Sequence, residues 1–233
     1  VFSLEGIHAK IFTPWGCGKL DSPLIGEFNL SNLLLVVAAL GSILKDLPMI
    51  LSALKKAKAP PGRMDTLGIK YQSKSIDKSG AAIENERPLV IIDYAHTPDA
   101  LEKALMALRE HCTGLIICVF GCGGDRDSGK RPMMAKVAEK LANRVIVTSD
   151  NPRMESLSKI KEETFVGFCK PEKAEYYESR AEAIKTAINK ARKGDAVLVA
   201  GKGHEEYQII GKEKIFFSDR VECLKALEAL NHD

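Results

Sequence analysis

From Pro88 onward, short apolar runs alternate with amphipathic segments, and this alternation restricts the fold more than any other feature of the chain. The apolar runs are rich in valine and isoleucine and end in polar or glycine-containing loops, as strands do. The segments between them repeat apolar residues every three or four positions, as helices do. Strands that alternate with helices form a parallel sheet covered on both faces. The sequence therefore predicts an α/β fold with a Rossmann-like, mostly parallel sheet.

The expected elements can be assigned to residue ranges. Strands are predicted at 89–93, 115–120, 144–148 and 196–200, helices at 97–108, 131–141, 157–165 and 179–191, and hairpins at 68–80 and 208–217. A last helix is predicted at 219–230, with Asp219 as its N-cap. Pro98 suits the first turn of its helix, where a backbone N–H has no partner within the helix.

The first 60 residues follow a different pattern. Residues 7–25 are strand-like but interrupted by glycine and proline, so an irregular segment is expected there. Asn29 is a plausible N-cap for the next helix, and Asn32 would lie one turn later on the same face. Residues 33–40 are apolar on every side, which predicts a buried helix. A second, short helix is expected at 47–56.

Residues 59–62, Ala-Pro-Pro-Gly, form the clearest boundary, because proline and glycine interrupt helices and strands alike. A length of 233 residues suggests about one and a half to two domains. We therefore expect one unit at 1–60 and a second at 61–233. The chain also begins within a pattern and without methionine, so we expect it to be a piece of a longer protein.

Composition argues against several classes of protein. The formal net charge of +3 is too small to indicate nucleic-acid binding. The longest apolar run, 33–40, is too short to cross a bilayer, and no signal-peptide pattern opens the chain, so no membrane span is expected. The 6 cysteines form no CxxC pair, which indicates a reduced, cytoplasmic protein. We also expect a monomer.

The motif Asp150, Asn151, Pro152 and Arg153 follows the predicted strand at 144–148. Proline cannot continue a strand's hydrogen bonding. Arg153 would then stand at the carboxyl edge of the sheet, where open α/β sheets bind their ligands. Its planar guanidinium suits a carboxylate. The alternative interpretation is a helix N-cap followed by a solvated arginine.

Residues 121–124, Gly-Cys-Gly-Gly, allow a ligand to approach the backbone closely. A dinucleotide-binding fingerprint would need glycine at position 126, but this residue is Arg126, so NAD is not expected. We expect the Arg126 side chain to contact an anion instead. Lys130 and Arg131 place positive charge at a helix start, where the helix dipole does not favour it, and this again suggests a ligand. Alternatively, the charges at 125–127 pair with one another on the surface.

Asp93, His96 and Thr97 lie between a predicted strand and the helix that starts near Pro98. A carboxylate, an imidazole and a hydroxyl at a helix N-terminus suit the phosphate edge of a magnesium nucleotide. The alternative is a structural histidine in an ordinary loop.

Residues 201–205, Gly-Lys-Gly-His-Glu, follow the predicted strand at 196–200. Neither this segment nor any other in the sequence has the GxxxxGK[ST] pattern, so no triphosphate cradle is predicted. Paired His/Cys metal spacings, HExxH and GxSxG are missing as well, and no metal site is predicted. Cys118 and Cys122 are interpreted as packing thiols.

In their order along the chain, residues 93–98, 119–132, 150–153 and 201–205 together resemble the C-terminal domain of the Mur ligases. Residues 26–32 and 61–64 resemble the same family. The resemblance implies that residues 1–60 are the tail of a central ATP-binding domain, and that residues 61–233 are the C-terminal, amino-acid-binding domain. The family's phosphate loop and carboxylated lysine are missing from this sequence, so we expect no catalytic residue in it and no activity from it alone.

The motifs most resemble the branch of the family that adds meso-diaminopimelate to UDP-MurNAc-L-Ala-D-Glu in peptidoglycan synthesis, through an acyl phosphate. The resemblance implies ATP and Mg²⁺ as cofactors, and the UDP-MurNAc-dipeptide and meso-diaminopimelate as substrates. It implies nucleotide contacts from Asn32, Arg63, Asp93, His96 and Thr97. It implies diaminopimelate contacts from Arg126, Asp150, Asn151, Arg153, Gly201 and Glu205.

Three alternatives stay open. They are a lysine-adding member of the family, another ligase of the superfamily such as a folylpolyglutamate synthetase, and a non-catalytic amino-acid-binding module. The lysine-adding branch does not carry the pattern at 150–153, and that pattern together with 201–205 argues against a folylpolyglutamate synthetase. The missing phosphate loop is the reason to keep the binding module.

Overall fold

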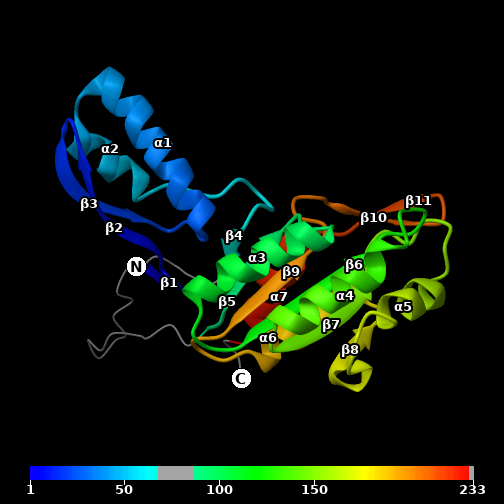
Figure 1. The fold of residues 1–233 in the computed structure, drawn as a ribbon. Coiled ribbons are helices and arrows are strands. Elements are labelled where there is room, and N and C mark those ends of the chain that lie inside the picture. The colour runs from blue at the N-terminus through cyan, green and yellow to red at the C-terminus, as the bar shows by residue number, and fades with distance from the viewer. Residues whose placement is uncertain (68–86, 231–233) are drawn as a thin grey trace.

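A six-stranded sheet forms the centre of residues 61–233 (Figure 1). The computed structural model describes residues 1–67 and 87–230, so the hairpin predicted at 68–80 lies outside the described residues. In spatial order the strands are β4 (Asp65–Leu67), β5 (Leu89–Asp93), β9 (Ala196–Ala200), β6 (Ile116–Cys122), β7 (Arg144–Ser149) and β8 (Ala174–Tyr177). β4 runs antiparallel to β5 and the other neighbours are parallel, which confirms the predicted mostly parallel sheet.

Helices cover both faces of this sheet. One face carries α3 (Pro98–His111), α4 (Lys130–Leu141) and α5 (Leu157–Phe165), and the other carries α6 (Arg180–Lys190) and α7 (Asp219–Ala229). Successive strand residues point to opposite sides, so Phe120 belongs to the first core and Val119 to the second. The predicted α/β layering is therefore confirmed. β8 is not among the predicted strands, because its residues are only half-buried and form no apolar run.

Side-chain caps explain where three of the helices begin. The hydroxyls of Thr97, Ser156 and Ser179 accept the N–H groups of Ala100, Lys159 and Glu182, each at 3.3 Å. Such bonds satisfy N–H groups that have no partner inside the helix. The predicted hairpin near the C-terminus is confirmed as β10 (Tyr207–Ile210) paired antiparallel with β11 (Glu213–Phe216).

The first 60 residues contain a small sheet and two helices of their own, with a core distinct from the two cores of the large sheet, although Ile25 packs into the core beneath α3. β1 (Phe2–Ser3), β2 (Gly6–Thr13) and β3 (Gly16–Ser22) make an antiparallel sheet, followed by α1 (Glu27–Leu44) and α2 (Leu47–Leu54). The strand-like character expected at 7–25 is therefore confirmed, whereas the expected irregularity is wrong. Gly16 has φ +122° and opens β3 directly after the turn, where Thr13 Oγ1 donates to its carbonyl oxygen at 2.9 Å. This glycine permits the hairpin instead of interrupting a strand.

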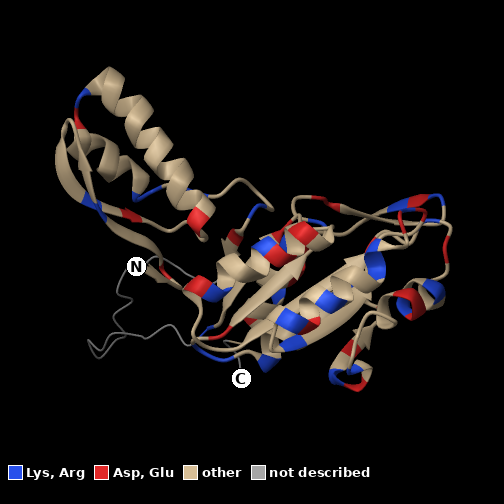
Figure 2. Cartoon of the chain, in the orientation of Figure 1, with Lys and Arg blue, Asp and Glu red and all other residues tan. Residues whose placement is uncertain are grey.

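The helix predicted at 33–40 is confirmed as part of α1, but the prediction that it is buried is wrong. In α1 the buried residues are Leu33, Val37 and Gly41. Leu35 is 69% exposed and Ile43 is 75% exposed. Figure 2 shows α1 as an almost unbroken uncharged helix, in contrast to α3 and α4. An apolar helix surface is buried only where another element covers it. By length and composition alone, the 18 residues of α1 could also cross a membrane, so the expected lack of a membrane span stays a prediction.

The start of α1 differs from the expectation as well. Its N-cap is Gly26, and Asn29 lies inside the first turn, where its amide donates to the Ile25 carbonyl at 2.8 Å. Asn32 does lie one turn later on the same face, since its amide donates to Asn29 Oδ1 at 3.3 Å.

His111, the last residue of α3, joins the two parts of the chain. Its Nε2 accepts the N–H of Gly26 at 2.9 Å, and its Nδ1 lies 2.6 Å from the carbonyl oxygen of Ser3. A carbonyl can only accept, so Nδ1 carries the proton and the ring is the neutral Nδ1–H tautomer. Burial lowers the pKa of His111, which favours this neutral form.

Candidate functional site

The carboxyl ends of β5, β9, β6 and β7 bring the four sequence motifs together at one edge of the sheet. Gly201 donates its N–H to the carbonyl of Asp93 at 3.0 Å, and Gly124 donates to the carbonyl of Asn151 at 2.9 Å. Asn151 in turn donates its amide to Glu205 Oε2 at 3.2 Å. Loops that are far apart in the sequence thus form one continuous surface, as expected for a parallel sheet.

The centre of this surface is a cluster of charged and amide side chains. Lys202 donates to Asn151 Oδ1 at 3.0 Å and to the carbonyl of Tyr207 at 2.7 Å. Its Nζ lies 3.7 Å from Asp150 Oδ1 and 3.6 Å from Glu205 Oε2. Gly201 has to be glycine here, because a Cβ would lie 2.8 Å from Asp150 Oδ2. Asp150, Asn151, Gly201 and Glu205, all predicted site residues, therefore meet around one ammonium group.

Lys202 was not among the predicted site residues. Its side chain is fully buried, which is rare for lysine unless it is paired. Burial lowers the pKa of the ammonium, the carboxylates of Asp150 and Glu205 raise it, and the Arg180 guanidinium also lowers it. Neighbours brought in from β7 and from the loop before β10 decide this burial, so the motif at 201–205 gives no sign of it.

Arg153 occupies a loop and not a helix start, so the alternative of an N-cap followed by a solvated arginine is wrong. Its backbone has φ +52° and pairs with β10, donating to the Ile209 carbonyl at 3.1 Å and accepting from Gly211 at 2.8 Å. Its guanidinium donates to the carbonyls of Gly124 at 2.8 Å and Asn151 at 3.4 Å. Carbonyl partners orient the positive charge without neutralising it.

The glycine loop is packed against the loop that carries Arg153. A Cβ on Gly124 would lie 1.8 Å from the carbonyl oxygen of Pro152, so only glycine fits this contact. Asp125 has φ +50°, donates its N–H to Glu155 Oε2 at 2.9 Å and accepts the N–H of Met154 at 3.1 Å. Asp125 therefore ties the two loops together. Arg126, the next residue, is exposed on the loop that Asp125 holds in place.

Arg131 has a different role from the one predicted. It is buried and donates to Glu163 Oε2 at 2.6 Å, to the carbonyl of Gly123 at 3.0 Å and to Glu155 through a short contact. Its charge is therefore balanced by two carboxylates of the chain and does not indicate a ligand. Lys130, its neighbour, lies 4.0 Å from Asp127.

A second buried arginine lies beneath the site. Arg180 binds both carboxylate oxygens of Asp219 at 2.7 Å, and donates to the carbonyls of Ala200 at 2.9 Å and Ser149 at 3.4 Å. Those carbonyls precede Gly201 and Asp150 directly. Asp219 is therefore an ion-pair partner and not the predicted helix cap. Ser218 occupies the N-cap position of α7, but its side chain forms no capping hydrogen bond.

The predicted nucleotide contacts lie at the end of β5 and the start of α3, with one exception. Both carboxylate oxygens of Asp93 accept backbone N–H groups, of Met64 at 2.8 Å and Ala95 at 2.9 Å, and burial raises the pKa of this carboxyl. Thr97 caps α3. Asn32 lies apart on the exposed side of α1, and its recorded hydrogen bond goes to Asn29.

An exposed cluster of cationic and aromatic side chains lies beside Asp93. The Arg63 guanidinium stacks 4.8 Å from the ring centre of Tyr94, whose ring also lies 4.6 Å from His96 and 5.7 Å from His204. Among residues 1–67 and 87–230, no group of three His, Cys, Asp or Glu side chains is arranged to hold a metal ion.

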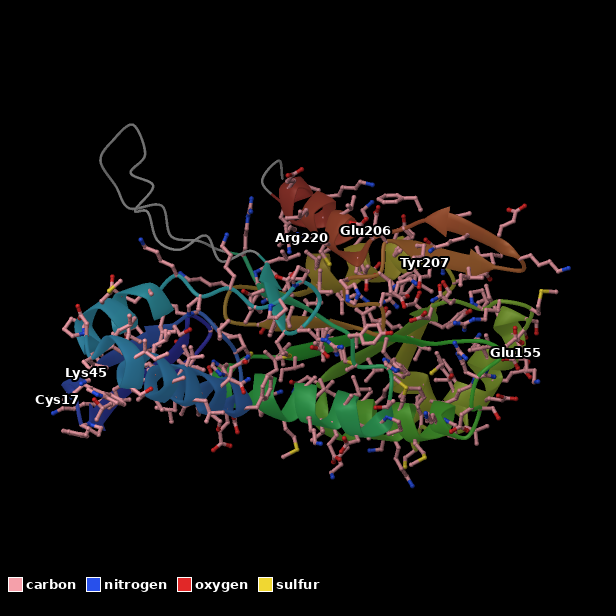
Figure 3. The ribbon with its side chains drawn as sticks, turned by 90° about the horizontal axis from the view of Figure 1, so that it is seen from above. Cys17, Lys45, Glu155, Glu206, Tyr207 and Arg220 are labelled. Carbon is pink, nitrogen blue, oxygen red and sulfur yellow. The ribbon has the colours of Figure 1, made fainter. Side chains whose placement is uncertain are left out.

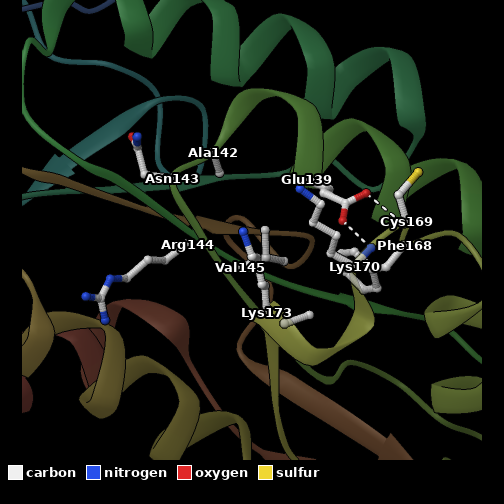
Figure 4. A pocket seen from close by; sticks show the side chains of 10 residues that line it. Glu139, Ala142, Asn143, Arg144, Val145, Phe168, Cys169, Lys170 and Lys173 are labelled. Atoms are coloured by element: carbon white, nitrogen blue, oxygen red, sulfur yellow. Dashed lines mark hydrogen bonds between the residues drawn. The ribbon is translucent and has the colours of Figure 1, made fainter.

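Figure 3 places Glu155 and Tyr207 toward the same end of the molecule, far from Cys17 and Lys45 in the first unit. A hollow of about 330 Å³ lies elsewhere, at the amino edge of the sheet (Figure 4). Its lining includes Glu139, Arg144, Lys170 and Lys173, none of which belongs to the predicted motifs. The predicted site and this hollow are therefore separate.

Comparison with known proteins identifies what these features are similar to. Residues 81–203 match the family model described as Mur ligase, glutamate ligase domain. A Haemophilus influenzae protein named UDP-N-acetylmuramoyl-L-alanyl-D-glutamate–2,6-diaminopimelate ligase is 49% identical over 97% of this chain and 43% of its own length. A Pseudomonas putida protein of the same name is 48% identical over 98% of this chain and 43% of its own length. The chain thus spans less than half the length of these curated relatives.

Solved structures give the same picture. A structure described as that of a UDP-N-acetylmuramoyl-L-alanyl-D-glutamate–2,6-diaminopimelate ligase shares 37% identity at a TM-score of 0.78, and the match covers 100% of this chain and 45% of that one. A folylpolyglutamate synthase from Thermotoga maritima shares 22% identity at a TM-score of 0.57 over 80% of this chain and 38% of its own, which indicates a common fold alone.

Proposed function

The chain belongs to the Mur ligase family, and on that premise we propose that it forms the amino-acid-binding part of an ATP-dependent ligase. The proposed reaction adds meso-diaminopimelate to UDP-MurNAc-L-Ala-D-Glu. The observation that carries the proposal is that an arginine and two carboxylates meet at the carboxyl edge. Within the described residues, the Arg153 guanidinium donates to the carbonyls of Gly124 and Asn151. The Asn151 side chain donates to Glu205, and Asp150 is the residue before it.

This arrangement suits one end of a zwitterionic amino acid. A guanidinium whose neighbours are carbonyls can take a substrate carboxylate through two parallel hydrogen bonds. Carboxylates that are not hydrogen-bonded to Lys202 can take the ammonium group. meso-Diaminopimelate has a carboxylate and an amine at its far end, whereas lysine has only the amine. Exposed Arg126, on the loop braced by Asp125, would add a second guanidinium for the carboxylate.

The nucleotide would bind at the neighbouring part of the same edge. The stacked Arg63 and Tyr94, with His96 beside them, offer charge and aromatic surface next to the N-terminus of α3. Anions are stabilised at helix N-termini, which supports a phosphate contact near Thr97. Each oxygen of Asp93 accepts one backbone N–H group, an arrangement that fixes the orientation of the carboxylate, and no step is assigned to Mg²⁺ through this chain.

In the proposed reaction the γ-phosphate of ATP moves to the D-glutamyl carboxylate, the amine of diaminopimelate attacks the acyl phosphate, and phosphate leaves. The residues described above would contribute by holding the amine donor in place. Fixing two reactants relative to each other removes most of the entropy cost of a bimolecular step. We further propose that residues 1–60 and 61–233 belong to two domains, and that the protein is a cytoplasmic monomer.

The decisive experiment replaces Arg153 with alanine in the intact ligase and measures kcat/KM for meso-diaminopimelate and for lysine. Losing one partner of a desolvated charge pair costs about 2–5 kcal/mol, so use of diaminopimelate should fall by orders of magnitude. Use of lysine should change little. Arg109→Ala is a matched control, because Arg109 also donates to main-chain carbonyls, of Gly114 at 2.8 Å and Cys112 at 3.2 Å, but lies at the other edge.

Equal losses for both amino acids would contradict the proposed selectivity, as would no loss for either. Efficient use of lysine by the unaltered protein would instead favour the lysine-adding activity. A protein that binds diaminopimelate but never releases ADP would favour a non-catalytic binding module.

A further inference from the structure

The Lys202 side chain is buried and has hydrogen-bond partners, which is unusual for a lysine in a loop. Its ammonium group is fully buried, and it donates to Asn151 Oδ1 and to the Tyr207 carbonyl at 3.0 and 2.7 Å. Both acceptors are neutral. The carboxylates of Asp150 and Glu205 lie at 3.7 and 3.6 Å, beyond ordinary hydrogen-bond distance. Lys202 therefore orients its neutral neighbours and forms no short hydrogen bond with either carboxylate.

The orientation of the Asn151 side chain follows from these contacts. Its Oδ1 accepts from Lys202 and from the N–H of Ile209 at 2.9 Å, and both groups can only donate. The amide nitrogen must then point the other way, where it donates to Glu205 Oε2 at 3.2 Å. Without Lys202, one of the two donors that fix this orientation would be lost.

The charges in the cluster do not cancel. Asp150 and Glu205 carry two negative charges against one positive charge on Lys202, and the nearby Arg180 is already paired with both oxygens of Asp219. Within this group, which does not include Arg153 with its carbonyl partners, one negative charge is therefore unmatched at a largely buried position. Because an unmatched buried charge is costly, the cluster is suited to accept one more cation.

We propose that Lys202 is a positioning residue that fixes Asn151, and through it Glu205, so that the ammonium group of the incoming amino acid can bind between Asp150 and Glu205. This inference rests on the proposed function. A merely structural role would also be consistent with the bond to Tyr207, which anchors the start of β10. The two roles differ in the kinetic constant that they affect.

The test uses the intact ligase and the variants Lys202→Met, Asn151→Ala and the double variant. If Lys202 acts by positioning the amino acid, Lys202→Met should raise KM for meso-diaminopimelate about ten-fold or more while KM for ATP stays within about two-fold. The double variant should show a KM for diaminopimelate no higher than the worse single variant, because both substitutions disrupt the same contact. Lys190→Met, on an exposed lysine, is the matched control.

An unchanged KM for diaminopimelate would overturn the proposal, and so would a parallel rise in both KM values or independent, multiplying effects in the double variant. If Lys202→Met does not fold, Lys202→Leu takes its place with the same outcomes, since it also removes the N–H donors that bind Asn151. Unaltered protein that shows no diaminopimelate-dependent ADP release would overturn the proposed function and this inference together. Active protein with an unaffected variant would overturn the inference alone.

Discussion

The two edges of the same sheet treat charged residues in opposite ways. At the carboxyl edge, Arg180, Lys202 and Asp219 are completely buried and each has partners within the chain. At the amino edge, Arg144, Lys170 and Lys173 are exposed around an open hollow. Figure 4 shows Arg144 extending away from Glu139, whose two oxygens accept the N–H groups of Cys169 and Lys170 at 2.8 Å each.

This difference shows that an open hollow does not by itself indicate a functional site. The hollow at the amino edge has the space, but the one carboxylate in its lining, Glu139, already accepts two backbone N–H groups, and the cations of the lining are exposed. At the carboxyl edge, the loops that follow the strands bring charged side chains close together, and burial removes these side chains from water. Functional chemistry is expected where perturbed charges converge, and that is the carboxyl edge.

The largest effect should come from breaking the buried pair at the carboxyl edge. Arg180→Leu leaves Asp219 charged and without its partner, so the free energy of unfolding should fall by about 3–5 kcal/mol. Urea unfolding followed by far-UV circular dichroism measures this loss. The double variant Arg180→Leu with Asp219→Leu removes both charges and should recover part of the stability. A double variant as unstable as the sum of the single variants would show that the charges act independently.

A smaller, pH-dependent effect is expected at the junction formed by His111 near the amino edge. Burial lowers the pKa of His111 in the folded state, the hydrogen bond to the Ser3 carbonyl raises it by less, and His8 lowers it further. The unfolded chain therefore binds a proton more readily, and stability present above the unfolded pKa of about 6.5 is lost as pH falls. Urea unfolding across this pH range should reveal the slope.

His111→Gln sharpens this measurement. Glutamine can donate to Ser3 and accept from Gly26 but does not titrate, so the slope should become shallower. His96→Gln, an exposed control, should leave the slope unchanged. Equal slopes for the unaltered protein and His111→Gln would show that this histidine does not link pH to stability.

The smallest effect is expected for an ion pair outside the buried cluster. Lys190 lies 2.6 Å from Glu175, closer than Arg180 lies to Asp219, but its side chain is 35% exposed. Exposed pairs gain little because water screens them, so Lys190→Ala should change the free energy of unfolding by less than about 1 kcal/mol. The same urea experiment tests it. A loss comparable to that of Arg180→Leu would remove the contrast between the two edges.

The sequence predicts the elements of the second unit well because their patterns are local. The apolar runs at 89–93 and 196–200 coincide with β5 and β9, and the caps at Thr97 and Ser179 mark helix starts. The assembly of the motifs at one edge also follows from the pattern, since parallel strands all end on the same side. These predictions need no information about long-range partners.

What the sequence could not predict depends on partners distant in the chain. Arg180 and Asp219 are separated by 39 positions, and nothing in the local pattern of either indicates burial. Arg131 looks like an unbalanced charge until Glu155 and Glu163 are placed beside it. Conversely, the apolar run in α1 suggests burial on every side, but whether a surface is covered is not a local property.

The position of β9 has a consequence for how the chain folds. β9 lies between β5 and β6 in the sheet, although its Ala196 pairs with Leu89, which is 107 positions earlier in the chain (196 − 89). During synthesis, β5 can pair with β4 and β6 with β7, but neither can pair with β9 before residue 200 has been made. Contacts of such long sequence separation slow folding, because a large loop must close before they form. Until then the facing edges of β5 and β6 present unpaired backbone groups, which are prone to pair with other chains. The nascent protein is therefore expected to need its longest protection from aggregation just before this strand inserts.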